Sequence, residues 1–499
     1  MGVQGATPPG LTSLKPHQAL LLLILATALT RVGFGWALGL GVDESYMVAS
    51  GRGLQLGYFD HPPASWWLAW GAARLFGSDA AVVVRLPFIA LFALSTWLMF
   101  RLTEVLYSAR AGFWAAVGIN LAPVLGVTTG GWVLPDGPLV CALLAAVFCF
   151  VRALTGGTRW WLGAGLFAGL ALFSKYSAVL TLGGAFLFLL TSREHRFWLG
   201  RWQPWAAVLV AFIVFSPVLS WNASHAWASF AFQGGRAEAA RLHPLAPLAT
   251  LGGEALFLLP WIWLALMAVF VRAVAAGPRD WRGWLLACLA APPIVLFVVI
   301  SLWSSQRVLY HWATPGYLML FPLLGQAVAV RLNGRARAVI VGTAALIVAA
   351  LLFVGSELRF AWVPAPLGPA LLALDPQLDS LDWTALREDL AARGLLTPGT
   401  VIATPRWQDA GKIDYGLGGG VPVIVLSPDA REYGFARPAS RFVGRDVVIL
   451  APGKTAAQVE PQFAARFTRI EKLPPLTLRR AGGPPLEIGV FLGTALRGT

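Results

Sequence analysis

Long apolar runs separated by short polar loops dominate the first 355 residues of the chain. Such runs constrain the fold strongly, because about 20 apolar residues in a helix span the hydrocarbon core of a bilayer. The whole 499-residue chain is 57% hydrophobic and only 12% charged, so we predict a polytopic α-helical membrane protein with about eleven spans. The candidate spans are residues 18–41, 80–103, 111–128, 134–152, 160–175, 176–191, 204–221, 246–271, 283–302, 311–330 and 337–355.

The fifth and sixth runs leave the number of spans open. They are short and meet at residues 174–176 without a recognisable turn. If they formed one helix, the orientation of every later span would invert. The first run carries Arg31 and has no convincing cleavage site, so we expect a membrane helix there rather than a signal peptide.

Positive charge decides the orientation, because Lys and Arg collect in short cytoplasmic loops. With eleven spans and the N-terminus inside, fourteen such residues fall in inner loops and seven in outer loops. Most acids and histidines of the membrane part then fall on the outer side, where we expect the chemistry. Topology and anionic lipid explain the net charge of +14, so we predict contact with membrane lipids and no nucleic-acid partner.

The character of the sequence changes after Gly355, where the apolar runs become short and acids become frequent. Segments with helix and strand patterns alternate there, so we predict a soluble, extracytoplasmic α/β domain over residues 356–499. No phosphate-cradling glycine motif is present in it. We expect helices at 379–390, 407–417 and 456–467, and strands at 400–404, 421–426 and 446–450.

The sequence contains no recognisable metal motif. Cys141, Cys149 and Cys288 all lie inside apolar runs, so neither a disulfide framework nor a CxxC site is expected. A divalent metal held by His61, His225 and an acid is left open, although no HxxH or HExxH spacing supports such a site. No other cofactor is indicated.

A dense polar stretch, DESYMVASGRGLQLGYFDHPP at residues 43–63, lies in the predicted first outer loop at 42–79. It begins with Asp43 and Glu44 and ends with Asp60 and His61, directly before a Trp-rich segment opened by proline. An acid at the centre of a membrane helix costs about 2–3 kcal/mol, but these acids lie at span ends, where the cost is small. They are therefore either ordinary loop acids and helix caps or parts of a site.

Further polar candidates lie at the same outer edge. Asp136 precedes a helix start and is either an N-cap or a second acid of a site near Asp43. Lys175 is a rare Lys in an Arg-rich chain, so it either snorkels or holds a lipid phosphate with its compact ammonium. A last cluster consists of Arg307, Tyr310, His311 and Trp312. It either contacts a headgroup, the role that we favour, or belongs to an aromatic belt.

Four short motifs resemble those of glycosyltransferase family 39. They are DE at 43–44, GYFDHPP at 57–63, LPDGPL at 134–139 and FSKY at 173–176. This GT-C family of integral-membrane enzymes contains protein O-mannosyltransferases and, as relatives, lipid A aminoarabinose transferases. The resemblance covers residues 18 to about 330, and residues 404–415 are similar to the tail of bacterial members with less specificity.

The resemblance implies a GT-C domain over residues 1–355 that uses a polyprenyl-phosphate sugar donor on the extracytoplasmic face of a bacterial inner membrane. The acceptor would be a hydroxyl of a lipid, a glycan or a protein. The catalytic residues that it implies are Asp43 as base, Glu44 beside it and Asp136 near the acceptor. The donor-binding candidates are Lys175, Asp60, His61, Arg307, Tyr310 and His311, although some relatives have Lys where His61 stands.

Two other classes of function remain to be weighed. A transporter or flippase of lipid-linked sugars could also use a basic outer groove, but transporters usually place ionisable residues near the bilayer midplane. A C-terminal binding module with a membrane anchor would not need eleven spans. The sequence therefore favours the glycosyltransferase.

Overall fold

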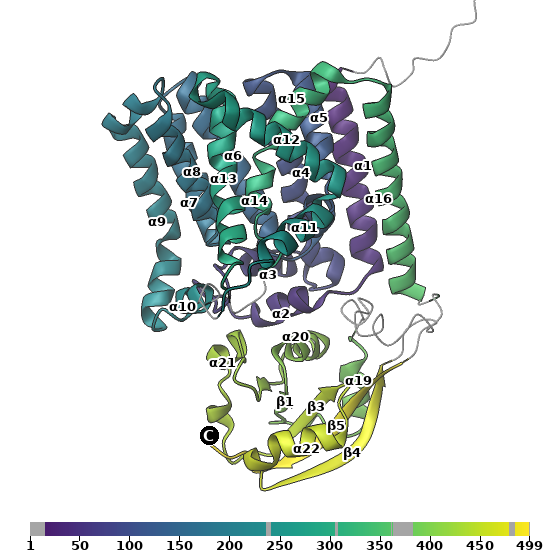
Figure 1. The fold of residues 1–499 in the computed structure, drawn as a ribbon. Helices are drawn as coiled ribbons and strands as arrows, with labels where there is room; N and C mark the ends of the chain where they lie inside the picture. The colour runs from purple at the N-terminus through teal and green to yellow at the C-terminus, as the bar shows by residue number, and fades with distance from the viewer. Residues whose placement is uncertain are drawn as a thin grey trace, which may run out of the picture.

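A computed structural model describes residues 15–235, 241–304, 308–360, 362, 383–478 and 485–498. A bundle of long helices stands above a small α/β domain, which faces one end of the bundle (Figure 1). We call this side of the bundle the domain end. Arg307 and the first four residues of the helix predicted at 379–390 lie outside the described residues.

Every apolar run predicted to span the membrane contains at least one helix. Seven helices of the described chain are long and apolar enough to cross a membrane, so the α-helical polytopic class is confirmed, whereas the count of eleven spans is not established. The seven are α1 (Pro16–Ala37), α4 (Ala81–Leu106), α6 (Asp136–Thr155), α9 (Trp202–Ser224), α12 (Pro260–Ala276) with its following turn, α13 (Trp281–Ile300) and α16 (Gly334–Phe360). Shorter bundle helices are α5 (Ala109–Leu121), α7 (Trp160–Ser174), α8 (Ala178–Thr191), α11 (Ala246–Leu258), α14 (Thr314–Leu318) and α15 (Phe321–Arg331).

The fifth and sixth predicted spans are separate helices, because the chain becomes extended at Lys175 between α7 and α8. The run at 246–271, in contrast, is not one helix, and that prediction is wrong. It breaks into α11 and α12 at Leu259, whose φ is +73°. The following Pro260 explains the break, since proline disfavours the helical conformation of the residue before it. The run at 311–330 is likewise divided into α14 and α15.

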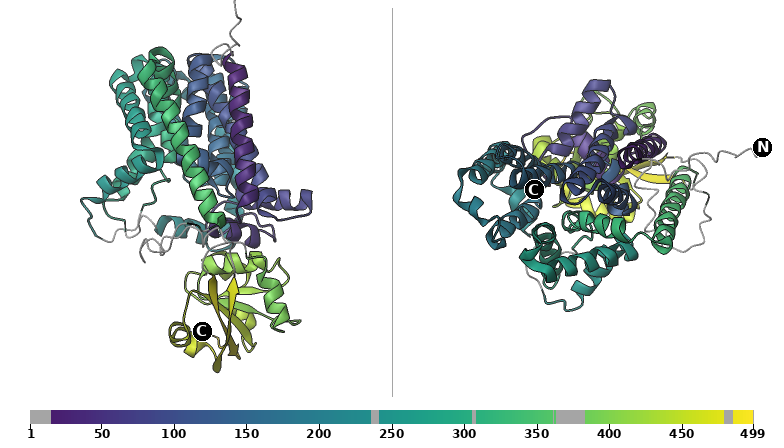
Figure 2. Two further views of the ribbon diagram at one scale, coloured as in Figure 1. Left: turned by 90° about the vertical axis from the view of Figure 1, so that its right-hand side faces the viewer. Right: turned by 90° about the horizontal axis from the view of Figure 1, so that it is seen from above.

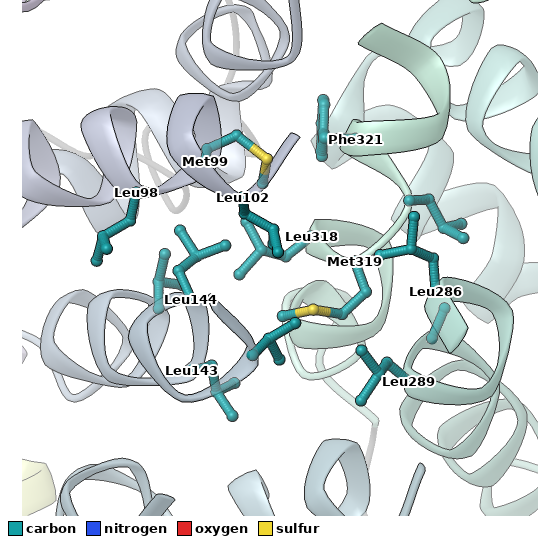
Figure 3. Packing of buried hydrophobic residues seen from close by; sticks show 14 of the residues in the cluster. Leu98, Met99, Leu102, Leu143, Leu144, Leu286, Leu289, Leu318, Met319 and Phe321 are labelled. Carbon is teal, nitrogen blue, oxygen red and sulfur yellow. The ribbon is translucent and has the colours of Figure 1, made fainter. Parts of the chain in front are cut away.

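Apolar side chains from α4, α6, α13, α14 and α15 meet in the centre of the bundle (Figure 3). Helix α6 is the most enclosed of the seven long helices, whereas α1 and α16 expose most of their surface and lie side by side at the edge (Figures 1 and 2). The first residue of α6 is Asp136. This carboxylate therefore stands at the domain end of the innermost helix.

Helices α7 and α9 touch along their backbones. A Cβ atom on Gly165 would come within 2.3 Å of the Ala207 carbonyl oxygen, and one on Gly169 within 2.8 Å of the Ala211 carbonyl oxygen. Glycine four residues apart permits this close approach of two membrane helices. The contact fixes the position of α7, and hence of Lys175 directly after it.

The C-terminal domain is the predicted small α/β layer. Its five-stranded sheet has the order β2-β1-β3-β5-β4, in which β1 is parallel to β2 and β3, and β5 is antiparallel to β3 and β4. The strands are β1 (Ile402–Thr404), β2 (Val423–Val425), β3 (Val447–Pro452), β4 (Arg469–Leu478) and β5 (Leu486–Thr494). Its helices are α19 (Leu386–Ala392), α20 (Trp407–Gly416), α21 (Glu432–Ala436) and α22 (Ala456–Phe463), of which α21 was not predicted.

Two short helices, α2 (Val42–Ser50) and α10 (Ala228–Gly235), lie between the bundle and the domain (Figure 1). A third, α3 (Ala64–Phe76), packs on α4 and α2 and projects to the side (Figure 2). Helix α2 packs directly on α20: a Cβ atom on Gly411 would come within 2.8 Å of the Tyr46 backbone nitrogen. The first loop is thus enclosed by the bundle on one side and by the domain on the other.

Candidate active site

An ion pair joins Asp136 to Lys175 at the domain end. The Lys175 ammonium donates to both carboxylate oxygens, at 2.9 and 3.0 Å, and the two side chains are only 11% and 14% exposed. Asp136 opens α6 and Lys175 separates α7 from α8, so three bundle helices meet at this pair. The structure brings together two residues that the sequence placed at one membrane edge.

A cavity of about 210 Å³ lies beside Lys175. Its polar wall is formed by His61, Lys175, Tyr176, Ser177 and Gln233, and its apolar wall by Leu296, Phe297, Ile300 and Trp312. His61 and His311 also lie close enough to Asp136 to interact electrostatically with its carboxylate. A small site with a fixed ammonium and neighbouring imidazoles suits an anionic group such as a phosphate.

A second cavity, of about 310 Å³, is lined almost entirely by apolar side chains of α6, α7, α8, α9 and α13. Some residues of the second cavity lie on the same helix faces as residues of the first cavity, because residues four or seven apart on a helix share one face. Thr181 follows Ser177 by four residues on α8, and Leu289 precedes Leu296 by seven on α13. Helix α13 and the start of α8 therefore contribute to both cavities, the polar one at the domain end and the apolar one farther from it.

Glu44 is buried in an ion pair with Arg85 of α4. The Arg85 guanidinium donates to its two oxygens at 2.8 and 2.5 Å, and the backbone N–H groups of Gly41 and Val133 donate at 2.8 and 3.0 Å. Although burial by itself raises the pKa of the Glu44 carboxyl, Arg85 and these hydrogen bonds hold that pKa below its ordinary value. Glu44 therefore ties α2 to α4 and to the segment that leads into α6.

Asp43 is exposed in the first turn of α2. A carboxylate is favoured there by the positive end of the helix dipole. Its neighbour Glu44 holds the start of α2 against Val133, which lies three residues before Asp136. The exposed Asp43 side chain is accessible to a substrate. It lies on a segment whose position is fixed relative to the ion pair of Asp136 and Lys175.

Asp60 points toward the C-terminal domain. Its carboxylate pairs with Arg431 at 2.9 Å, and its side chain is 6% exposed. The next residue, His61, lines the cavity. Sequence reasoning predicted Asp60 and His61 as donor-binding residues but missed Arg431, because nothing in the sequence around residue 431 signals a contact with residue 60.

The cluster predicted at residues 307–312 divides in the structure. The Tyr310 ring packs on α11, with its centroid 5.6 Å from that of Phe257. His311 lies near Asp136, and Trp312 forms part of the cavity wall. Of the described part of this cluster, only residues 311 and 312 are therefore next to the ion pair.

No metal site is formed by the described side chains. Among them, no group of three or more His, Cys, Asp or Glu residues could hold a metal ion. His225 instead stacks on Trp221 at 4.1 Å, and its Nδ1 lies 2.8 Å from the Trp221 carbonyl oxygen. The metal site considered for His61, His225 and an acid does not fit this arrangement.

The fold is a helical bundle with a polar site at one end and a small domain next to that site. Residues 60–221 match the family model described as dolichyl-phosphate-mannose-protein mannosyltransferase, which confirms the predicted resemblance. The match contains Asp60, His61, Asp136 and Lys175. Asp43 and the C-terminal domain lie outside it.

Among solved structures, the chain is similar to ArnT from Cupriavidus metallidurans. The apo form has a TM-score of 0.66 and 15% sequence identity over 97% of this chain and 100% of ArnT. The form bound to undecaprenyl phosphate has a TM-score of 0.64 and 15% identity over 96% and 99%. At this identity the likeness shows a shared fold, and no curated protein sequence matches the chain.

Proposed function

We propose that this protein transfers a sugar from a polyprenyl-phosphate donor to an acceptor hydroxyl on the extracytoplasmic face of a bacterial inner membrane. The observation that carries the proposal is the polar cavity at Lys175 together with an apolar cavity that shares α13 and the start of α8 with it. A polyprenyl phosphate has the same two parts, an anionic phosphate and a long apolar chain. The related ArnT structure with undecaprenyl phosphate supports this choice of lipid.

Lys175 would stabilise the phosphate that leaves when the sugar is transferred. A positioned cation that faces developing negative charge in a site poor in water stabilises a transition state strongly. Asp136 accepts two hydrogen bonds from the Lys175 ammonium and so orients it. In this proposal Asp136 acts on the donor through Lys175.

Asp43 would act as the general base. As the acceptor oxygen bonds to the anomeric carbon, the bond from that carbon to the phosphate oxygen breaks, the acceptor proton moves to the Asp43 carboxylate, and polyprenyl phosphate leaves. A positioned base contributes about 10²- to 10⁴-fold to such a step. Glu44 already accepts from Arg85 and two backbone amides, so we assign it to positioning Asp43.

Binding of undecaprenyl phosphate to the protein in nanodiscs, measured by native mass spectrometry, tests the donor site. Lys175→Ala should weaken binding by about 10- to 100-fold, because a hydrogen bond to a charged group contributes about 1.5–3 kcal/mol. Lys472→Ala, at an exposed lysine of the C-terminal domain, is the matched control and should bind like the parent. Equal binding by the parent and Lys175→Ala would remove Lys175 from the site.

A transporter of lipid-linked sugars remains the competing function. In proteoliposomes that contain the donor lipid and candidate acceptors, a transporter would move the lipid-linked sugar between leaflets without modifying any acceptor. A glycosyltransferase would instead release polyprenyl phosphate in proportion to the modified acceptor.

A further inference from the structure

Arg431 of the C-terminal domain has a backbone conformation that non-glycine residues rarely adopt. It precedes α21 with φ of +51° and ψ of −140°. Such conformations persist where the surroundings determine them, and they cluster at functional sites. The contacts of the Arg431 side chain show what determines its conformation.

The Arg431 guanidinium joins three segments that are distant in the sequence. It pairs with Asp60 of the first loop at 2.9 Å and with Asp429 of its own domain at 3.1 Å. Its central carbon lies 4.4 Å from the ring centre of Trp407 on α20 and 4.9 Å from that of Phe232 on α10. Only 18% of the Arg431 side chain is exposed, because two acids and two aromatic rings surround it.

Asp60 connects this arginine to the proposed donor cavity. The Asp60 carbonyl oxygen accepts a hydrogen bond from the Gln233 side chain, and His61 follows directly in the chain. Both Gln233 and His61 line the cavity beside Lys175. A displacement of Asp60 would therefore move two of the polar groups in the cavity wall.

The residue after Arg431 strengthens the same connection. Glu432 is buried, and its two carboxylate oxygens accept from the Gln55 side chain at 2.6 Å and from the Phe59 backbone amide at 2.9 Å. Burial raises the pKa of Glu432 to about 7. Arg431 and Glu432 together hold the chain from residue 55 to residue 60 against the start of α21.

We propose that Arg431 is a positioning residue of the donor cavity: from the C-terminal domain it fixes Asp60 and thereby places His61 and Gln233 beside Lys175. This inference rests on the proposed function for the identity of the ligand. The C-terminal domain then completes the cavity of the membrane part. Misplacement of groups around a reacting centre by about 1 Å can cost about 10²-fold in rate, so the effect of losing Arg431 should be measurable.

Hydrogen–deuterium exchange of the full-length protein in nanodiscs tests the positioning without reference to any activity. Arg431→Ala should accelerate exchange of the backbone amides at residues 55–61, whereas Arg431→Lys, which keeps the charge, should accelerate it less. Arg469→Ala is the matched control, because Arg469 is 74% exposed and pairs only with Glu471 among the ion pairs of the described residues. Unchanged exchange at 55–61 in a folded Arg431→Ala variant would overturn the inference.

A double-mutant cycle with Asp60→Asn tests whether Arg431 acts through Asp60. Arg431→Ala should weaken undecaprenyl phosphate binding by about 10-fold or more in the parent but much less in the Asp60→Asn background, since residues in one network are not additive. The double variant also removes both charges and so avoids a buried, uncompensated carboxylate. Equal losses of binding in both backgrounds would contradict the inference. If the parent protein bound no undecaprenyl phosphate, the proposed function would be refuted, and the exchange experiment alone would test whether Arg431 positions Asp60.

Discussion

Asp43 and Glu44 are adjacent acids at the start of α2 with opposite environments. Asp43 is exposed, whereas Glu44 is 2% exposed and pairs with Arg85. A general base must reach the acceptor hydroxyl, and of these two carboxylates only that of Asp43 is exposed. A buried carboxylate with an arginine and two amide donors is better suited to holding α2 in place.

Replacing Glu44 by Gln should therefore destabilise the protein. The change leaves the Arg85 guanidinium buried without its counter-ion, which typically costs about 3–5 kcal/mol. A thermal unfolding scan of the purified protein should show a clearly lower midpoint. Replacing Glu44 and Arg85 together by Met should recover part of the loss, because no buried charge is then left unpaired; a Glu44→Gln variant as stable as the parent would contradict this role.

The sequence placed Lys175, Asp136 and His61 at one membrane edge, and the structure brings the three side chains close together. The sequence could not distinguish the roles of Asp43 and Glu44. That distinction depends on Arg85, which is 41 residues away, and on which side of α2 faces α4. Pairings of this kind are set by packing, which local sequence patterns do not encode.

Helix α7 depends on two glycines for its contact with α9. Gly169→Ala should destabilise the bundle by about 1–3 kcal/mol, since its Cβ atom would come within 2.6 Å of the Val214 Cβ atom and the backbones cannot separate freely. Gly183→Ala on α8 is the control, because no heavy atom lies within 4 Å of its added Cβ. Thermal unfolding of both variants measures the difference, and equal midpoints would show that α7 and α9 do not pack this closely.

Most helices were predictable because apolar periodicity and length identify a membrane span. The break at Leu259 was not foreseen. Pro260 is a signal for it, but Pro87 and Pro217 lie inside continuous helices, so proline alone does not decide where a membrane helix ends. Helix α21 is only five residues long and is held by contacts with the first loop, and so short a segment has too little periodicity to be predicted.

The membrane part and the C-terminal domain share a buried polar interface. Arg52 of the first loop bonds to Asp414 of α20 at 3.2 Å, and the Lys412 ammonium donates to the Leu40 carbonyl oxygen. One apolar cluster also continues from Tyr46 on α2 to Trp407 on α20. The domain is therefore an integral part of the structure around the first loop. The sequence did not indicate this interface, because its two regions were interpreted separately.

The proposed orientation of the whole molecule can be tested with single cysteines. Positive charge in the loops opposite the domain predicts that the domain is extracytoplasmic. Ala465→Cys in the domain should react with a membrane-impermeant maleimide on intact spheroplasts, and Ala276→Cys at the opposite end should react only after permeabilisation. Both positions are exposed, and Cys141, Cys149 and Cys288 are buried, so the background should be low. The reverse labelling pattern would invert the topology.

The central claim is that the protein transfers a sugar with Asp43 as base, and mass spectrometry of envelope glycolipids and glycoproteins tests it most directly. A deletion strain should lack a glycolipid or glycoprotein that is one sugar heavier than its unmodified acceptor. The parental gene should restore this species, and so should a Glu388→Gln control, which changes an exposed acid in the first turn of α19. Asp43→Asn, expressed at the parental level in the membrane, should fail to restore it. Parental amounts of the modified species with Asp43→Asn, or an unchanged profile in the deletion strain, would contradict the account.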